Sequence, residues 1–123
     1  MSILMLQAFY HLMRFDFYLS RGNFQALYAK VRFYPLGPPR AASDSTRICH
    51  AIDLACIWYW KEILCLQRSA ATTCLLRKYG SPAQLILAAQ QFPFKAHAWV
   101  EVEGRVVNDK PYMQEIYGIL DRC

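Results

Sequence analysis

The chain has 123 residues, of which 55% are hydrophobic, 15% aromatic and 19% charged. This length suits one domain, and the composition excludes a disordered chain because enough apolar surface is present to offset the entropy lost on folding. We therefore expect a single globular domain over residues 1–123.

The excess of basic residues lies in the N-terminal third. Residues 1–40 hold five basic residues and one acidic residue, within a formal net charge of +5 for the whole chain. These charges form no run and accompany no nucleic-acid-binding motif, so we expect no nucleic-acid partner. An acidic peptide or an acidic protein surface suits them at least as well.

The cysteines form an odd set without any C-x-x-C pair: Cys49, Cys56, Cys65, Cys74 and Cys123. This pattern argues against a disulfide framework and a zinc site, and it indicates a reducing cytosol. We expect neither a metal nor another cofactor. The apolar residues 1–13 lack the basic start and cleavage site of a signal peptide, and a membrane span needs about 20 apolar residues. They are expected to form a core or docking helix, with peripheral membrane contact as the lesser alternative.

Two helices are predicted in the N-terminal third, over Ile3 to Phe15 and Phe24 to Phe33, with a break at residues 20–23. The segment from Tyr34 to Ser45 is rich in Pro and Gly and is predicted to be a linker.

Two more helices are predicted after the linker. The first has N-cap candidates at its start and apolar residues at helical spacing, and it should end between Trp60 and Ile63; these residues are Ser43, Asp44 and Ser45, and Ile48, Ile52, Cys56 and Tyr59. The second should run from Cys65 to Tyr79, because Gly80 suits a left-handed C-cap and Pro82 prevents continuation.

From Ala83 the hydrophobic period changes from 3.6 to 2, which predicts strands over Ala83 to Ala89 and Ala96 to Glu103. Helices followed by a small antiparallel sheet make an α+β fold. One face of the second strand is expected to be core, namely Ala96, Ala98, Val100 and Val102. The other face should line solvent or a site, namely His97, Trp99, Glu101 and Glu103.

A hairpin is predicted at Gly104, with Arg105 to Asp109 as the return strand. With a three-residue loop that holds Gly104 in the left-handed region, His97 would stand opposite Asp109, with Cβ atoms about 5 Å apart. A two-residue loop would instead put Asp109 on the Ala98 face. The first register makes His97 a general base that a carboxylate orients.

Cys65 is the candidate nucleophile for this base. It stands at the expected start of a helix, where unpaired N–H groups and the helix dipole favour a thiolate, and Arg68 lies one turn further on. Each of these three residues also has a structural interpretation. A cysteine at a helix start, a strand histidine beside an aromatic residue and an aspartate in a turn are all common as structural residues. The other four cysteines, together with His11 and His50, are expected to be structural.

Three segments resemble the leader peptidase of lasso-peptide biosynthesis, the protease part of the B maturation protein: CLQRSAATTCLLRKYG (65–80), PFKAHAWVEVEGRVVND (93–109) and YGILDR (117–122). This family belongs to the papain-like and transglutaminase-like cysteine enzymes. The family's catalytic Cys, His and Asp fall on Cys65, His97 and Asp109. The resemblance implies a papain-like/transglutaminase-like fold, and we expect Trp99 to shield the His–Asp pair and contact substrate.

The resemblance further implies a cytoplasmic bacterial thiol protease that removes the leader from a precursor peptide. It would work beside an asparagine-synthetase-like macrolactam cyclase and a separate leader-recognition protein. Residues 1–45 would then be a helical docking segment and linker, and residues 46–123 the catalytic core. A transamidase or amidase with the same triad, and a non-catalytic scaffold that delivers precursor to the cyclase, are the alternatives. The Cys65 N–H can supply one oxyanion donor, and the second donor is not assigned.

Overall fold

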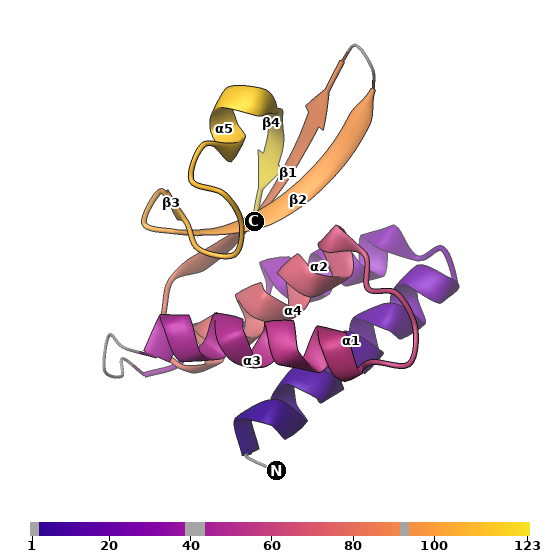
Figure 1. The fold of residues 1–123 in the computed structure, drawn as a ribbon, viewed down its shortest axis with the longest axis vertical. Helices are drawn as coiled ribbons and strands as arrows, with labels where there is room; N and C mark the ends of the chain where they lie inside the picture. The colour runs from indigo at the N-terminus through magenta and orange to yellow at the C-terminus, as the bar shows by residue number, and fades with distance from the viewer. Residues whose placement is uncertain (1–2, 39–43, 92–93) are drawn as a thin grey trace.

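The computed structural model describes residues 3–38, 44–91 and 94–123. Four helices come first along the chain, and a block of strands follows that contains one short helix (Figure 1). The helices are α1 (Ile3–Ser20), α2 (Phe24–Arg32), α3 (Asp44–Trp58), α4 (Cys65–Lys78) and α5 (Met113–Ile116), and the strands are β1 (Ala83–Gln90), β2 (Lys95–Val102), β3 (Arg105–Val106) and β4 (Gly118–Arg122).

The strands form one antiparallel sheet in the order β3-β2-β1-β4. Helices α1 to α4 pack together against one face of this sheet, and α5 lies on the other side (Figure 1). The predicted α+β architecture of helices followed by a small antiparallel sheet is therefore confirmed.

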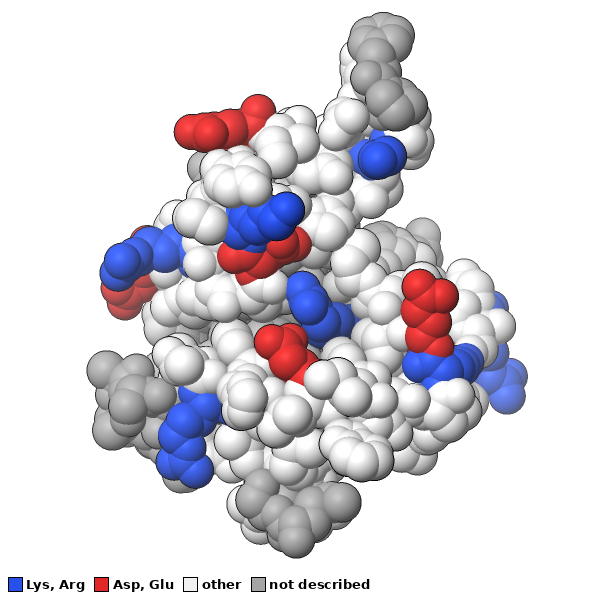
Figure 2. All heavy atoms as spheres, in the orientation of Figure 1, with Lys and Arg blue, Asp and Glu red and all other residues white. Residues whose placement is uncertain are grey.

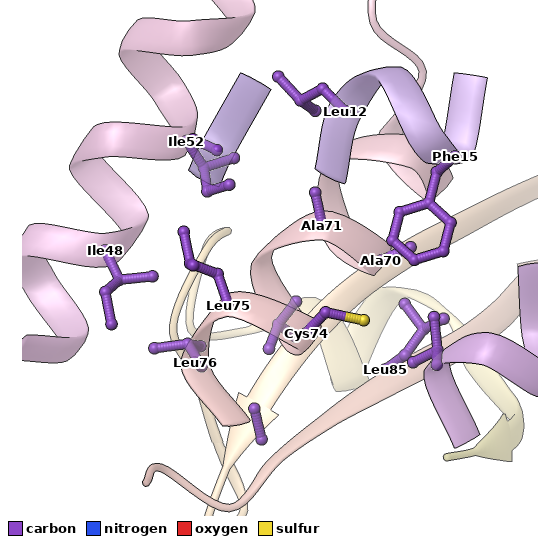
Figure 3. Close-up of a cluster of buried hydrophobic side chains, with 14 of the residues drawn as sticks. Leu12, Phe15, Ile48, Ile52, Ala70, Ala71, Cys74, Leu75, Leu76 and Leu85 are labelled. Atoms are coloured by element: carbon purple, nitrogen blue, oxygen red, sulfur yellow. The ribbon is translucent and has the colours of Figure 1, made fainter. Parts of the chain in front are cut away.

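Helix α4 occupies the centre of the main core. Every residue from Ser69 to Leu76 is buried, so this helix is covered on all sides rather than along one stripe. Ala70 and Ala71 have small side chains, which lets neighbouring elements approach closely. Figure 3 shows the side chains around it, with Leu12 and Phe15 from α1, Ile48 and Ile52 from α3, and Leu85 from β1.

The N-terminal helices belong to this same core. Phe15 of α1 and Leu27 and Val31 of α2 have no exposed surface and join the cluster around α4. Burying such side chains contributes roughly 1.5–3 kcal/mol each. Whatever else residues 1–45 do, α1 and α2 therefore help to hold the fold together.

Helix α4 begins and ends as the sequence predicts. Leu64 is extended, with φ −76° and ψ 154°, and Cys65 is the first helical residue. At the other end Gly80 has φ +92°, its N–H donates to Arg77 O, and the Ser81 N–H donates to Leu76 O. These two bonds form a Schellman motif, which requires the left-handed conformation that glycine adopts easily.

Other boundaries differ from the predictions. Helix α1 continues to Ser20, five residues beyond the predicted end, and Asp16, Tyr18 and Leu19 in this last part are half-buried. Helix α3 begins at Asp44 and ends at Trp58, and the N-cap candidate Ser43 lies outside the described residues. Helix α5 and strand β4 were not predicted from periodicity, since four helical residues and a fully exposed strand carry no such pattern.

The predicted register of the hairpin is wrong. The observed pairs are Glu101 with Val106 and Val102 with Arg105, so the loop has two residues. Glu103 and Gly104 have φ +53° and +80°, as the two central residues of a type I′ turn do. Such a turn matches the twist of paired strands. It requires a positive φ at Glu103, whereas the predicted three-residue loop placed only Gly104 in the left-handed region.

The second face of β2 is also more buried than predicted. Trp99 and Glu101 are 0% and 1% exposed, so at these two positions the face lines neither solvent nor a site. A small second core explains this difference, because Met113 of α5 packs there with Trp99, Ile86 and Ala88.

None of the helices in the described ranges combines the length and hydropathy that crossing a bilayer requires. Figure 2 shows one face of the molecule, on which basic and acidic side chains are interspersed rather than gathered by sign.

Candidate active site

Cys65 stands where the chain enters α4, with its side chain partly exposed. The N–H groups of a first helical turn have no partner within the helix and present a positive end of the dipole to the thiol. Cys65 and His97 line the same pocket, which has a volume of about 240 Å³. The rest of its wall is apolar and includes Phe24 of α2 and Leu120 of β4.

A second, more polar hollow also borders Cys65. It has a volume of about 490 Å³, and Lys61, Glu62 and Arg68 line it together with Cys65. The candidate nucleophile therefore lines both an apolar pocket and a hollow with charged residues in its wall.

His97 and Asp109 form the hydrogen bond that the sequence predicts. His97 Nε2 lies 2.7 Å from Asp109 Oδ2, and the two side chains are 22% and 17% exposed. The other carboxylate oxygen, Oδ1, accepts a 2.8 Å bond from the Lys110 N–H.

Asp109 is held as a carboxylate. Burial raises the pKa of this group, but the hydrogen bonds from His97 and from the Lys110 N–H outweigh burial and lower the pKa below its usual range. An ionised Asp109 fixes the His97 proton on Nε2, which leaves Nδ1 as the nitrogen that can accept a proton.

Aromatic rings enclose the imidazole. Tyr117 stacks on His97 with ring centroids 5.2 Å apart, and Trp99 lies 6.1 Å away. Trp99, which we expected to contact substrate, has no exposed surface, and its indole N–H donates to Glu101 Oε2 at 2.9 Å. In this structure Trp99 can shield the His–Asp pair but presents no surface to a peptide.

The remaining cysteines lie in environments that suppress reactivity. Burial raises the pKa of Cys49 and of Cys56 to about 11 and that of Cys74 to about 12, and it also raises the pKa of Cys123. These four thiols are therefore protonated at neutral pH, in agreement with the prediction that they are structural.

Arg68 has other partners than the thiol it was expected to assist. Its Nη2 donates to the Asn108 carbonyl at 2.8 Å, and Nη1 lies 3.7 Å from Asp53 Oδ1. Among the residues that the structure describes, no three His, Cys, Asp or Glu side chains are grouped so that they could hold a metal ion.

Two residues at the site escaped prediction from pattern. Asn108 was predicted only as part of the return strand from Arg105 to Asp109, yet its side chain bonds to β2 and to α4. Tyr117 appeared only in a segment of family resemblance, and nothing in its local sequence signals that it stacks on His97. For Asn108, the available signal was its position next to Asp109, the predicted orienting carboxylate.

A family model described as "Transglutaminase-like superfamily" matches residues 11–121. The chain belongs to the transglutaminase-like superfamily.

One curated relative of this transglutaminase-like chain is the microcin J25-processing protein McjB of Escherichia coli. The two sequences are 36% identical over 56 residues, which is 46% of this chain and 27% of the relative. The match thus spans about a quarter of the relative's length. No solved structure matches the chain.

Proposed function

We propose that this chain is a cysteine peptidase that cleaves the leader from a lasso-peptide precursor, with Cys65, His97 and Asp109 as its catalytic triad. The observation that carries the proposal is the 2.7 Å contact between His97 and Asp109 beside a pocket that Cys65 also lines. Membership of the transglutaminase-like superfamily and similarity to a microcin J25-processing protein favour peptide chemistry at this site.

In the proposed reaction, Cys65 Sγ attacks the carbonyl carbon of the scissile peptide bond while His97 Nδ1 takes the thiol proton. The C–N bond then breaks, His97 gives that proton to the leaving amine, and the leader remains attached to Cys65 as a thioester. Water attacks the thioester, His97 removes a proton from it and returns the proton to Cys65 Sγ. Asp109 keeps the imidazole in the required tautomer throughout.

The first turn of α4 supplies part of the charge stabilisation. The Cys65 N–H lies among the unpaired donors of the helix start, so it can donate to the oxyanion that forms on the attacked carbonyl. The apolar pocket with Phe24 and Leu120 in its wall would accept a side chain next to the scissile bond.

We also propose that a separate leader-recognition protein delivers the precursor, and that α1 is where it docks. All exposed residues of α1 before Ser20 are apolar, and they recur at alternating spacings of three and four: Ile3, Leu6, Tyr10, Met13 and Phe17. We call these five residues the α1 stripe. This spacing is that of a seam that packs on another helix. The cyclase that closes the macrolactam ring would act on the released peptide, in the bacterial cytosol.

A transamidase is the alternative enzyme, because an amine can replace water as the group that attacks the thioester in the second step. Incubation of the chain with precursor and recognition protein, with and without an added primary amine, distinguishes the two by mass spectrometry. A peptidase gives a free leader carboxylate under both conditions, whereas a transamidase gives the amide when amine is present. A scaffold gives neither product.

A further inference from the structure

The chain leaves the hairpin just before the candidate catalytic carboxylate. The Val107 N–H still donates to Val100 O at 3.0 Å, as one half of an antiparallel pair does. The Val100 N–H, however, donates to the side-chain oxygen Oδ1 of Asn108 at 2.8 Å. The amide side chain of Asn108 thus takes the place of a backbone acceptor at the last rung of the ladder.

This replacement of a backbone acceptor by the Asn108 side chain determines the position of Asp109. Continued pairing in the observed register would set Asp109 opposite Ala98, on the face away from His97. Because Asn108 completes the ladder with its side chain, the backbone is free to bend, and Asp109 reaches His97 Nε2 at 2.7 Å.

The other polar groups of Asn108 are held by α4, the helix that begins with Cys65. Asn108 Nδ2 donates to Ser69 Oγ at 3.1 Å, and Ser69 Oγ donates in turn to Ala98 O, next to His97, at 3.1 Å. The Asn108 carbonyl accepts from Arg68 Nη2 at 2.8 Å. Ser69 is fully buried, so these bonds are protected from competition with water.

We propose that Asn108 is a positioning residue that sets Asp109 against His97 and fixes this pair relative to Cys65. It bonds to the strand of His97 through one atom of its amide and to the helix of Cys65 through the other, while Asp109 is its immediate neighbour in the chain. Asn108 acts through Asp109 and contacts no reacting atom. This inference rests on the proposed Cys65, His97 and Asp109 triad.

The test is a double-mutant cycle between Asn108 and Asp109. Asn108→Ala should lower kcat for precursor cleavage by about tenfold or more and leave KM within about twofold, since it removes an orienting contact and no substrate contact. In an Asp109→Ala background, the same substitution should have almost no further effect, because the group through which it acts is gone. An equal loss in both backgrounds would overturn the proposal.

A second readout keeps the inference separate from the proposed substrate. Alkylation of Cys65 by iodoacetamide at pH 7 needs no precursor, and Asn108→Ala should slow it in the wild-type background alone. If no lasso precursor is cleaved but this coupling persists, the proposed function fails and the positioning role stands. If cleavage occurs and the coupling is absent, the reverse holds.

Two further variants distinguish positioning from a general loss of stability. Ser69→Ala removes a single oxygen from α4 and should slow alkylation by a few fold in the same non-additive way. Ser45→Ala removes one side-chain hydrogen bond, to Ser81 Oγ at 3.2 Å, near the hairpin turn. That turn lies about 16 Å along β2 from His97, so Ser45→Ala should leave the alkylation rate unchanged. An equal effect of Ser45→Ala and Ser69→Ala would mean that general destabilisation, rather than positioning, explains the result.

Discussion

His97 Nε2 lies 2.7 Å from Asp109 Oδ2, although the register of the hairpin would place the two side chains on opposite faces of the sheet. The contact is made by a bend after Val106 and not by cross-strand pairing. The orientation of the proposed general base therefore depends on the hydrogen bonds of a loop, which substitutions can disturb without disrupting the sheet.

Asp109→Asn should reduce kcat for leader cleavage by about 10²-fold or more, because an amide can hold the imidazole in the wrong tautomer and cannot stabilise the imidazolium. Steady-state kinetics with precursor and recognition protein measure this effect. Glu115→Gln, which neutralises an exposed carboxylate on α5, is the matched control and should leave kcat unchanged. Activity within about threefold of wild type for Asp109→Asn would remove Asp109 from the triad.

Thiol labelling should select Cys65. The other four cysteines have pKa values that burial raises, to about 11 for Cys49 and Cys56, whereas Cys65 lines a pocket at a helix start. Iodoacetamide at pH 7 followed by peptide mapping should therefore find Cys65 modified first, with all five cysteines modified once urea unfolds the chain. Faster labelling of Cys49 or Cys56 would show that the reactive thiol has been misplaced.

The stability of the chain should fall as the pH is lowered from about 6.5 to about 4, and His11 is the reason. His11 is 3% exposed, and burial, helped by Arg14 and Lys78, lowers its pKa from 6.5 to about 4. The unfolded chain therefore takes up a proton first as the pH falls, which favours unfolding until the folded form is protonated too. The full shift corresponds to a loss of about 3 kcal/mol.

Urea unfolding at several pH values between 4 and 7.5 tests this expectation. His11→Phe should flatten the dependence in this window, since a phenyl ring suits the neighbours Phe15 and Tyr34 and carries no proton. His50→Gln changes an exposed histidine of α3 and should keep the wild-type slope. If His11→Phe also keeps that slope, another group is responsible for it.

Disrupting the α1 stripe should weaken binding of the recognition protein. Tyr10→Glu and Met13→Glu place charges in an exposed apolar seam, so they should raise the dissociation constant by about tenfold or more and slow partner-dependent cleavage. Iodoacetamide labelling of Cys65 should not change, because these side chains point away from the core. Phe33→Glu, at an exposed aromatic residue after α2, is the control.

Charge should contribute to the same association. Arg14→Glu and Arg21→Glu should slow binding to an acidic partner in a salt-dependent manner, given the basic excess of the N-terminal third. Equal cleavage with and without the recognition protein would contradict the docking role. Binding of α1 to anionic lipid vesicles with no effect of these variants on the partner would assign the stripe to a membrane surface instead.

Sequence patterns predicted the parts of the fold that depend on local chemistry. Helix α4 begins at Cys65 as expected and ends at Lys78, close to the predicted end and just before Gly80, because a long helical run and a glycine C-cap are local signals. Strand β4 pairs with β1 from about 30 residues away and is fully exposed, so periodicity could not reveal it.

The candidate site was predicted by its residues and only partly by its geometry. The contact between His97 and Asp109 is present, but the three-residue loop proposed for it is not. Glu103 adopts a positive φ, which makes the two-residue turn possible, and the side chain of Asn108 ends the hydrogen-bond ladder between β2 and the return segment. The turn type and the hydrogen bond of Asn108 each have alternatives of similar local energy. Tertiary contacts select between these alternatives, so the local sequence does not predict them.

The most direct measurement of the central claim is to trap the acyl-enzyme. Wild-type chain is mixed with precursor and recognition protein, quenched with acid within one turnover and analysed by intact-mass and peptide-level mass spectrometry. We predict a leader fragment attached through a thioester to Cys65, which added hydroxylamine releases, and no adduct or cleavage with Cys65→Ala. Cys49→Ala, at a half-buried thiol outside the pocket, should form the adduct normally. Cleavage by Cys65→Ala, or an adduct on another cysteine, would contradict the account.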